Sequence, residues 1–274
     1  MLNDITLGQF FPVDSPIHKL DPRVKIMSSL AYIIAVFFAK GFAGYLFVAV
    51  FTYSVILMSK VPLKLYLKGL KPLIFIIIFT SAINLFMTDG KIAQIGSVPL
   101  KFGIFKITVE GIDTAVKMTL RLIFLVAGTS VLTFTTSPIV LTDGIESLLS
   151  PFKKIGVPAH ELAMMMSIAI RFIPTLLEET DKIMKAQASR GADFENGSVI
   201  KRIKALVPIL VPLFISSFRR ADELALAMEC RCYRGGKGRT RLKTLKIAPI
   251  DYIACAFMLV FIVVIGAIAL FVRV

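Results

Sequence analysis

Tryptophan is absent from this chain of 274 residues, and histidine and cysteine occur only two and three times. So few thiols and imidazoles exclude a disulfide framework and leave too few ligands for a dedicated metal site. Acidic residues are also scarce, because 18 Asp and Glu stand against 32 Lys and Arg, which gives a formal net charge of +14. The sequence contains no Gly-x-x-x-x-Gly-Lys-Ser/Thr phosphate loop, so the chain itself is not expected to hydrolyse ATP.

Apolar residues, by contrast, are abundant: the chain is 56% hydrophobic and its mean hydropathy is +0.80. Soluble domains reach about 45–50% apolar residues only when glycine is counted, so this composition indicates an integral membrane protein rather than a soluble enzyme. A β-favouring stretch within 88–109 indicates a small extracellular β-hairpin. The predicted membrane spans lie at about 24–39, 43–59 and 72–87, within Glu110–Thr136, and at Ile250–Val272.

Basic residues are distributed unequally around these spans. Residues 137–248 hold 18 of the 32 Lys and Arg, and the short segments before the first span and after the second are also basic. Loops rich in Lys and Arg face the cytoplasm, which places the N-terminus and residues 137–248 inside. The expected organisation is an N-terminal membrane domain with four spans (1–136), a cytoplasmic domain (137–248) and a C-terminal transmembrane helix (249–274).

The predicted cytoplasmic domain is not a polar loop, because long stretches follow a helical period. Helices are predicted near 143–155, 158–189 and 198–232, and the last two are amphipathic. Their apolar cores are short and interrupted by proline or arginine, which favours helices lying along the cytoplasmic face over two further spans. The fold class is therefore an all-α integral membrane protein with about five transmembrane helices, seven being the alternative, plus long cytoplasmic amphipathic helices.

The last two predicted helices end on matching sequences. Residues 181–191 align with residues 222–232 at an offset of 41, where an Asp, an Ala and an Arg coincide. Arg190 and Arg231 are the coinciding arginines. A single cation at a helix C-terminus is common because it favours the helix dipole, but two in a repeat indicate contacts to two similar partner surfaces.

Opposite charges precede the two arginines. Glu178 and Glu179 align at the same offset with Arg219 and Arg220. Crossing helices can use this complementarity, although exposed ion pairs contribute only about 0–1 kcal/mol.

The chain resembles the transmembrane T component of energy-coupling factor transporters, relatives of ABC transporters that import vitamins and metals. That family carries two short Ala-Arg-Gly-like motifs at the ends of cytoplasmic coupling helices. Here they stand as Ser189-Arg190-Gly191 and Cys230-Arg231-Cys232, which retain the arginine and small neighbours but not the plain Ala-Arg-Gly form. The amino-terminal segment 8–25 and the run 227–236 are also similar to the family, so the resemblance covers essentially the whole chain.

The resemblance implies a non-catalytic coupling subunit in the bacterial plasma membrane that works with two ABC-type ATPases and a membrane-embedded, substrate-binding S component. Each motif arginine, Arg190 and Arg231, would sit in an acidic groove of one ATPase, flanked by Ser189, Gly191, Cys230 and Cys232. No cofactor is expected on this chain, because the ATPases would use the ATP. The lipid membrane is a further expected partner and nucleic acid is not.

Composition alone leaves one alternative function, a self-sufficient membrane carrier or channel. A membrane-embedded hydrolase would need paired carboxylates or a nucleophile with a base inside the spans. Outside the fourth predicted span, these segments are almost free of titratable residues.

Overall fold

The structure is a computed structural model of the chain. It describes residues 9–88, 94–95, 98–99, 101–102, 105–106, 108–192, 199–236 and 245–271. The chain divides into two compact units. We call Gln9–Ser137 together with Leu245–Val274 the membrane unit, and Pro138–Thr244 the crossed-helix unit. Helices dominate both units, which confirms the predicted all-α class.

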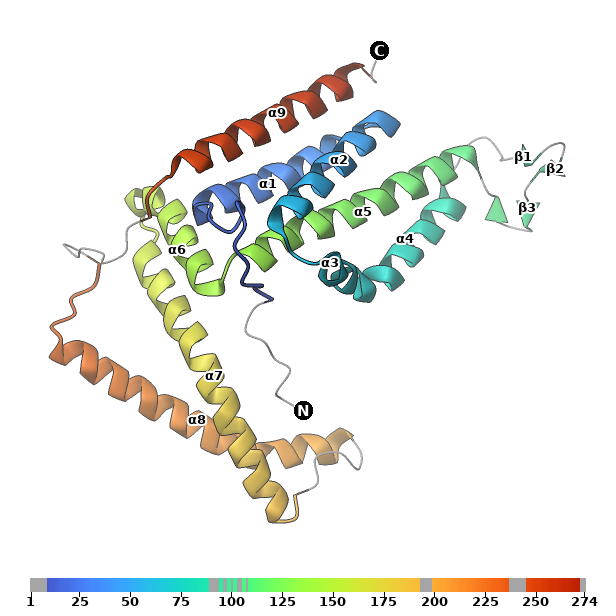
Figure 1. The fold of residues 1–274 in the computed structure, drawn as a ribbon. Coiled ribbons are helices and arrows are strands. Elements are labelled where there is room, and N and C mark those ends of the chain that lie inside the picture. Colours follow the sequence, from blue (N-terminus) through green and yellow to red (C-terminus); the bar gives the residue numbers. More distant parts are fainter. Residues whose placement is uncertain are drawn as a thin grey trace. The chain divides into compact units, whose positions relative to one another are not determined.

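The membrane unit consists of helices packed side by side (Figure 1). Helix α5 contacts α1, α2, α3 and α4, and α1 also contacts α9. The bounds are α1 Pro22–Phe38, α2 Gly41–Ser59, α3 Leu63–Leu70, the 3₁₀ turn η1 Lys71–Leu73, α4 Ile74–Met87, α5 Val109–Thr135 and α9 Pro249–Phe271.

Aromatic side chains fill the centre of the membrane unit, where α1, α2 and α9 meet. The Phe51 and Phe261 rings stack with centroids 3.8 Å apart, and Tyr32 stacks on Phe261 at 5.9 Å. The Tyr32 hydroxyl lies 2.7 Å from Thr52 Oγ1 and 3.0 Å from the carbonyl oxygen of Phe124. Because this hydroxyl is hydrogen-bonded, the Tyr32 ring is buried without leaving an unpaired polar atom.

Short antiparallel strand pairs lie between α4 and α5 in the chain, where the sequence predicts a β-hairpin. Strand β1 (Gln94–Ile95) pairs with β2 (Val98–Pro99), and β3 (Lys101–Phe102) pairs with β4 (Phe105–Lys106). Each described strand has two residues, so the described residues of this region form two small antiparallel pairs.

Five helical stretches of the described residues are long and apolar enough to cross a membrane, which agrees with the predicted number. The five stretches are not the same five segments as the predicted spans. Helix α1 has 17 residues and is shorter than all five, whereas Ala159–Ser189 qualifies although the sequence favours its lying along the cytoplasmic face. That orientation stays a prediction. The five stretches are Gly41–Ser59, Leu63–Leu85, Val109–Thr135, Ala159–Ser189 and Pro249–Phe271.

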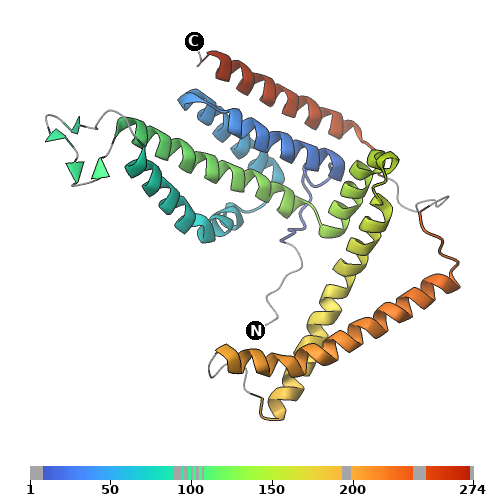
Figure 2. The same ribbon diagram turned by 180° about the vertical axis from the view of Figure 1, so that it is seen from behind.

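The crossed-helix unit is dominated by two long helices that pack against each other. Figures 1 and 2 show from opposite sides that α7 and α8 cross, and the first part of α7 also packs on α6. Proline lies inside α7 at position 174 and inside α8 at positions 208 and 212. The bounds are α6 Pro138–Leu149, the 3₁₀ turn η2 Ser150–Ile155, α7 Ala159–Ser189 and α8 Val199–Cys230.

Candidate functional site: two arginine-capped helix ends

Arg190 is the C-cap residue of α7, with φ −89° and ψ 6°. The next residue, Gly191, adopts a left-handed conformation with φ +88°. Its N–H donates to the carbonyl oxygen of Ala188 at 2.9 Å, and the Ala192 N–H donates to that of Gln187 at 3.1 Å. These two bonds define a Schellman motif, which satisfies carbonyl groups left without a partner at the end of a helix.

Arg231 follows the end of α8 in the same way. The Cys232 N–H donates to the carbonyl oxygen of Glu229 at 2.8 Å, and the Tyr233 N–H donates to that of Met228 at 3.0 Å. Each bond joins residues 41 positions after those of the first motif. The sequence offset is therefore also an offset in backbone geometry, and both arginines occupy the same place in the same cap.

The two caps differ in the residue that takes the left-handed conformation. Cys232 has φ +54°, which is uncommon for a residue with a Cβ atom, whereas glycine adopts such angles freely. The helix predicted to run through Cys232 ends instead at Cys230, so Cys232 lies outside it. Ser189 and Cys230, the last helical residues, are exposed, as are Arg190 and Arg231. Both cations are thus available to a partner.

An ion pair joins the two helices where they cross. Arg220 Nη2 lies 2.6 Å from Glu179 Oε2, and both side chains are partly buried. This confirms the complementarity indicated by the opposite charges at the shared offset. Each member precedes the motif arginine of its own helix by eleven residues, from 179 to 190 and from 220 to 231, which is about 16 Å of helix. The ion pair therefore marks the start of two arms of equal length.

The first half of α8 presents a large apolar surface. A monomeric soluble protein rarely exposes so many clustered apolar side chains, and such surfaces mark contacts with proteins or lipid. The exposed residues are Ile200, Ile203, Leu206, Val207, Leu210, Val211, Phe214, Ile215 and Phe218.

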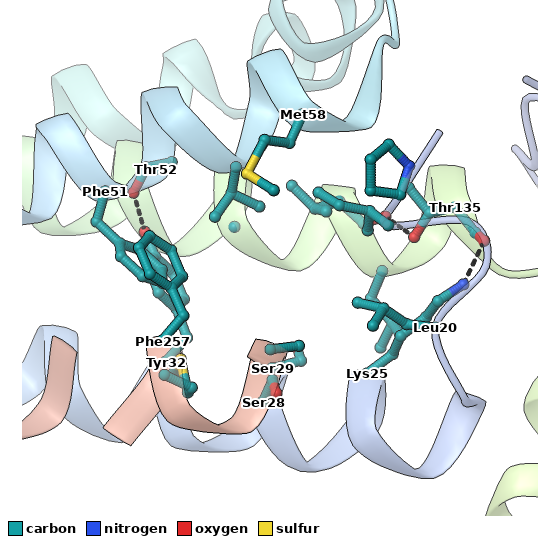
Figure 3. A pocket seen from close by; sticks show the side chains of 18 of the residues that line it. Leu20, Lys25, Ser28, Ser29, Tyr32, Phe51, Thr52, Met58, Thr135 and Phe257 are labelled. Carbon is teal, nitrogen blue, oxygen red and sulfur yellow. Dashed lines mark hydrogen bonds between the residues drawn. The ribbon is translucent and has the colours of Figure 1, made fainter. Parts of the chain in front are cut away.

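A cavity of about 280 Å³ lies in the membrane unit (Figure 3). At one end, the Lys25 ammonium donates to the carbonyl oxygens of Thr135 at 2.9 Å and His18 at 3.1 Å. At the other end lie Tyr32 and Thr52. Lys25 thus ties the end of α5 to the segment before α1. This is a packing role that the sequence did not reveal, because Lys25 reads there as a basic flank of the first span.

Asp251 has a role that is likewise not apparent from the sequence. It is 1% exposed, and its Oδ1 accepts the Asp21 N–H at 2.8 Å while its Oδ2 accepts the Ala248 N–H at 2.7 Å. One carboxylate therefore holds the N-termini of α1 and α9 together. Only an acidic residue in the first turn of α9 hinted at this, and the partner 230 residues away carries no local signal.

Asp21 is the N-cap of α1 and Pro22 is its first residue, and both residue types are favoured at these positions. Its side chain accepts the Arg23 N–H at 2.9 Å. The Arg23 guanidinium also donates to Oδ2 at 2.9 Å and to Oδ1 at 3.0 Å. These hydrogen bonds to the charged form lower the pKa of the Asp21 carboxyl.

Among the described residues, no group of three or more His, Cys, Asp or Glu is placed to hold a metal ion. The fold and the paired caps instead define a multi-pass membrane protein whose two crossed helices each end beside an exposed arginine.

Comparison with known proteins identifies the family of membrane proteins to which the chain belongs. The family model described as cobalt transport protein, CbiQ, matches residues 14–242. The chain is 60% identical over 263 residues to the energy-coupling factor transporter transmembrane protein EcfT of Clostridium kluyveri, covering 95% of this chain and 96% of that protein. The EcfT protein of Thermosediminibacter oceani is 55% identical, over 92% of this chain and 93% of that protein. The EcfT protein of Bacillus subtilis is 46% identical, over 89% of this chain and 91% of that protein. The chain belongs to this family, the transmembrane components of energy-coupling factor transporters.

Proposed function

We propose that the chain is the coupling subunit of an energy-coupling factor importer in the bacterial plasma membrane. In this proposal it links two cytoplasmic ATPases to a membrane-embedded S component that binds a vitamin or another micronutrient. The matched Schellman caps, which present Arg190 and Arg231 in the same backbone setting, are the observation that carries the proposal. Two equal caps suit two similar partners.

Each motif arginine would bind carboxylates in a groove of one ATPase. The planar guanidinium offers a fixed fork of donors that pairs with a carboxylate through two hydrogen bonds, which lysine cannot do. Ser189, Gly191, Cys230 and Cys232 would allow the groove to approach closely, because they are small and exposed.

The arms beyond the Glu179–Arg220 ion pair would transmit the motion of the ATPases. When the two ATPases close on ATP, the arginines that they hold must approach each other. A rotation of α7 against α8 about the crossing would accommodate this movement, since each arm extends about 16 Å beyond it. ATP binding and hydrolysis would occur in the ATPases, and the N-terminus and crossed-helix unit would face the cytoplasm.

The exposed apolar residues of α8 support a second contact. A surface of this kind is suited to the S component or to the membrane surface, because both offer an apolar counterpart. The substrate would then be chosen by the S component, while this chain would transmit movement to it.

Charge reversal at the motif arginines tests the proposal. Arg190→Glu and Arg231→Glu should each release one ATPase from the purified complex and abolish ATP-driven uptake, because a carboxylate would then face the acidic groove. Arg219→Glu is the control, because Arg219 is an exposed arginine that directly precedes the ion-paired Arg220 and lies outside both motifs; this variant should retain both ATPases. Full assembly and full uptake in both motif variants would refute the proposal. Substrate flux through the protein reconstituted without ATPases would instead favour a self-sufficient carrier.

A further inference from the structure

A second cavity, of about 610 Å³, lies within the crossed-helix unit. Its walls come from the first half of α7, the last turns of α8 and the residues that follow α8. We call it the arginine cavity. It is lined by Met164, Ser167, Ile168, Arg171, Phe172, Leu224, Met228, Arg231, Cys232, Tyr233, Arg234 and Gly235.

The segment after the second cap closes the arginine cavity by packing on the start of α7. A Cβ atom added to Gly236 would lie 2.7 Å from Cδ2 of His160, so glycine is required for this close approach. His160 is in turn held by Glu146 of α6, with Nδ1 and Oε1 3.0 Å apart. The return of the chain is therefore fixed, which keeps Tyr233 and Arg234 beside α7.

Three of the lining residues are arginines, Arg171, Arg231 and Arg234, and none is acidic. Within the described part of the chain, no carboxylate forms an ion pair with any of the three. Cations gathered around one hollow repel each other and attract an anion. The other walls are largely apolar, with Phe172, Leu224 and three further aliphatic or thioether side chains. The lining thus suits a carboxylate carried on a partly apolar peptide segment.

The sequence around the first motif differs in charge. At the offset of 41, Arg234 corresponds to Asp193 and Arg171 corresponds to Pro212. The two motifs are therefore equivalent in their caps and unequal in the charge around them. A partner with a more acidic surface would bind better at the second.

We propose that the arginine cavity receives an acidic segment of the ATPase bound at Arg231, and that Arg171 and Arg234 are specificity-determining residues for that ATPase. This inference rests on the proposed function, because it assumes that Arg231 contacts an ATPase. The cavity is continuous with that contact, since Arg231 and Cys232 line both. Charge complementarity then assigns the more acidic of two non-identical ATPases to the second motif.

The experiment isolates the second motif in the Arg190→Glu background, where one ATPase should remain bound. This chain and its S component are placed in lipid nanodiscs, and the affinity for the ATPase that binds the second motif is measured by titration with that ATPase. Arg171→Gln and Arg234→Gln should each weaken it about ten-fold, the size of one hydrogen bond to a charged group. Arg219→Gln, which removes an arginine outside the cavity lining, should leave the affinity within two-fold.

The outcomes separate the two proposals. If Arg231→Glu abolishes binding while the Arg171→Gln/Arg234→Gln double variant binds within two-fold of its parent, the cavity proposal alone is overturned. If Arg231→Glu leaves binding unchanged, the proposed function fails, and the cavity proposal fails with it.

A second measurement detects occupancy directly. Ser167→Cys places a thiol on the cavity wall contributed by α7, in a chain whose three native cysteines are replaced by alanine. Its reaction with a maleimide should slow about ten-fold or more when the ATPases bind. Equal labelling with and without ATPases would overturn the proposal. So would protection that needs no ATPase but disappears when anionic phospholipid is left out of the nanodiscs, because a lipid headgroup would then be the occupant.

Discussion

Substituting the left-handed residue of each cap, Gly191 in the first and Cys232 in the second, should change the stability of the two caps in opposite directions. Gly191→Ala places a Cβ atom at φ +88°, whereas Cys232→Gly removes one at φ +54°. A non-glycine residue in the left-handed region costs roughly 1–2 kcal/mol. A Cβ added at Gly191 would meet no atom within 4 Å, so the cost there is conformational and contains no steric clash. We therefore expect Gly191→Ala to destabilise the first cap by about 1 kcal/mol and Cys232→Gly to stabilise the second by a similar amount.

Backbone amide hydrogen exchange of the assembled protein in nanodiscs measures this effect. The Ala192 and Tyr233 amides report on the caps, because each donates the longer-range hydrogen bond of its Schellman motif. About 1 kcal/mol corresponds to roughly a five-fold change in the local opening equilibrium. Exchange at Ala192 should accelerate by that factor in Gly191→Ala, and exchange at Tyr233 should slow by it in Cys232→Gly. Changes of the same sign in both variants, or of less than two-fold, would refute the assignment of strain to Cys232.

Three further predictions concern packing. In a double-mutant cycle, Glu179→Gln and Arg220→Gln should show a coupling of about 0.5–1 kcal/mol in denaturant unfolding, because both side chains are partly solvated; zero coupling would mean that the pair does not hold the crossing. Asp251→Ala should lower the free energy of unfolding by about 2–4 kcal/mol, because it leaves two backbone N–H groups without their acceptor. Asp113→Ala, at an exposed ion pair, should lower it by under about 1 kcal/mol, and similar losses in the two variants would contradict this prediction. The pKa of Asp21 in the folded state is lowered from 3.8, so its contribution to stability is complete above about pH 4 and is lost as the pH falls further. The thermal unfolding temperature of Asp21→Asn should therefore depend less on pH below pH 4 than that of the wild type.

The sequence predicted the features that depend on local spacing. Helical periodicity placed the long helices of the crossed-helix unit, and the offset of 41 identified both Arg190 and Arg231 and the charge pair at the crossing. The start of α1 is also a local feature, because its capping by Asp21 involves only neighbouring residues.

Features that depend on tertiary packing carried no such signal. The predicted helix near 198–232 extends two residues beyond the observed end of α8 at Cys230, because a cysteine, unlike a glycine, does not indicate a left-handed conformation at position 232. Arg171 lies in the apolar half of α7, where it interrupts a hydrophobic run, and only the fold brings it to the cavity shared with Arg231, 60 residues later. Asp251 likewise acquires its role only when α9 returns to α1.

The crossed-helix unit combines symmetry in its backbone with asymmetry in its side chains. The ion pair and both caps follow one offset, so a rotation at the crossing would displace the two arginines through equal arcs. The surroundings do not follow it. Of the two left-handed cap residues, Gly191 is a glycine and Cys232 is not, and the second cap joins a cavity lined by two additional arginines. Equal arms suit two ATPases that close as a pair, and unequal surroundings suit partners that are not identical. In the proposed function each ATPase binds its own arm and both arms move together, which requires both properties. The offset of 41 accounts for the first property and does not constrain the second.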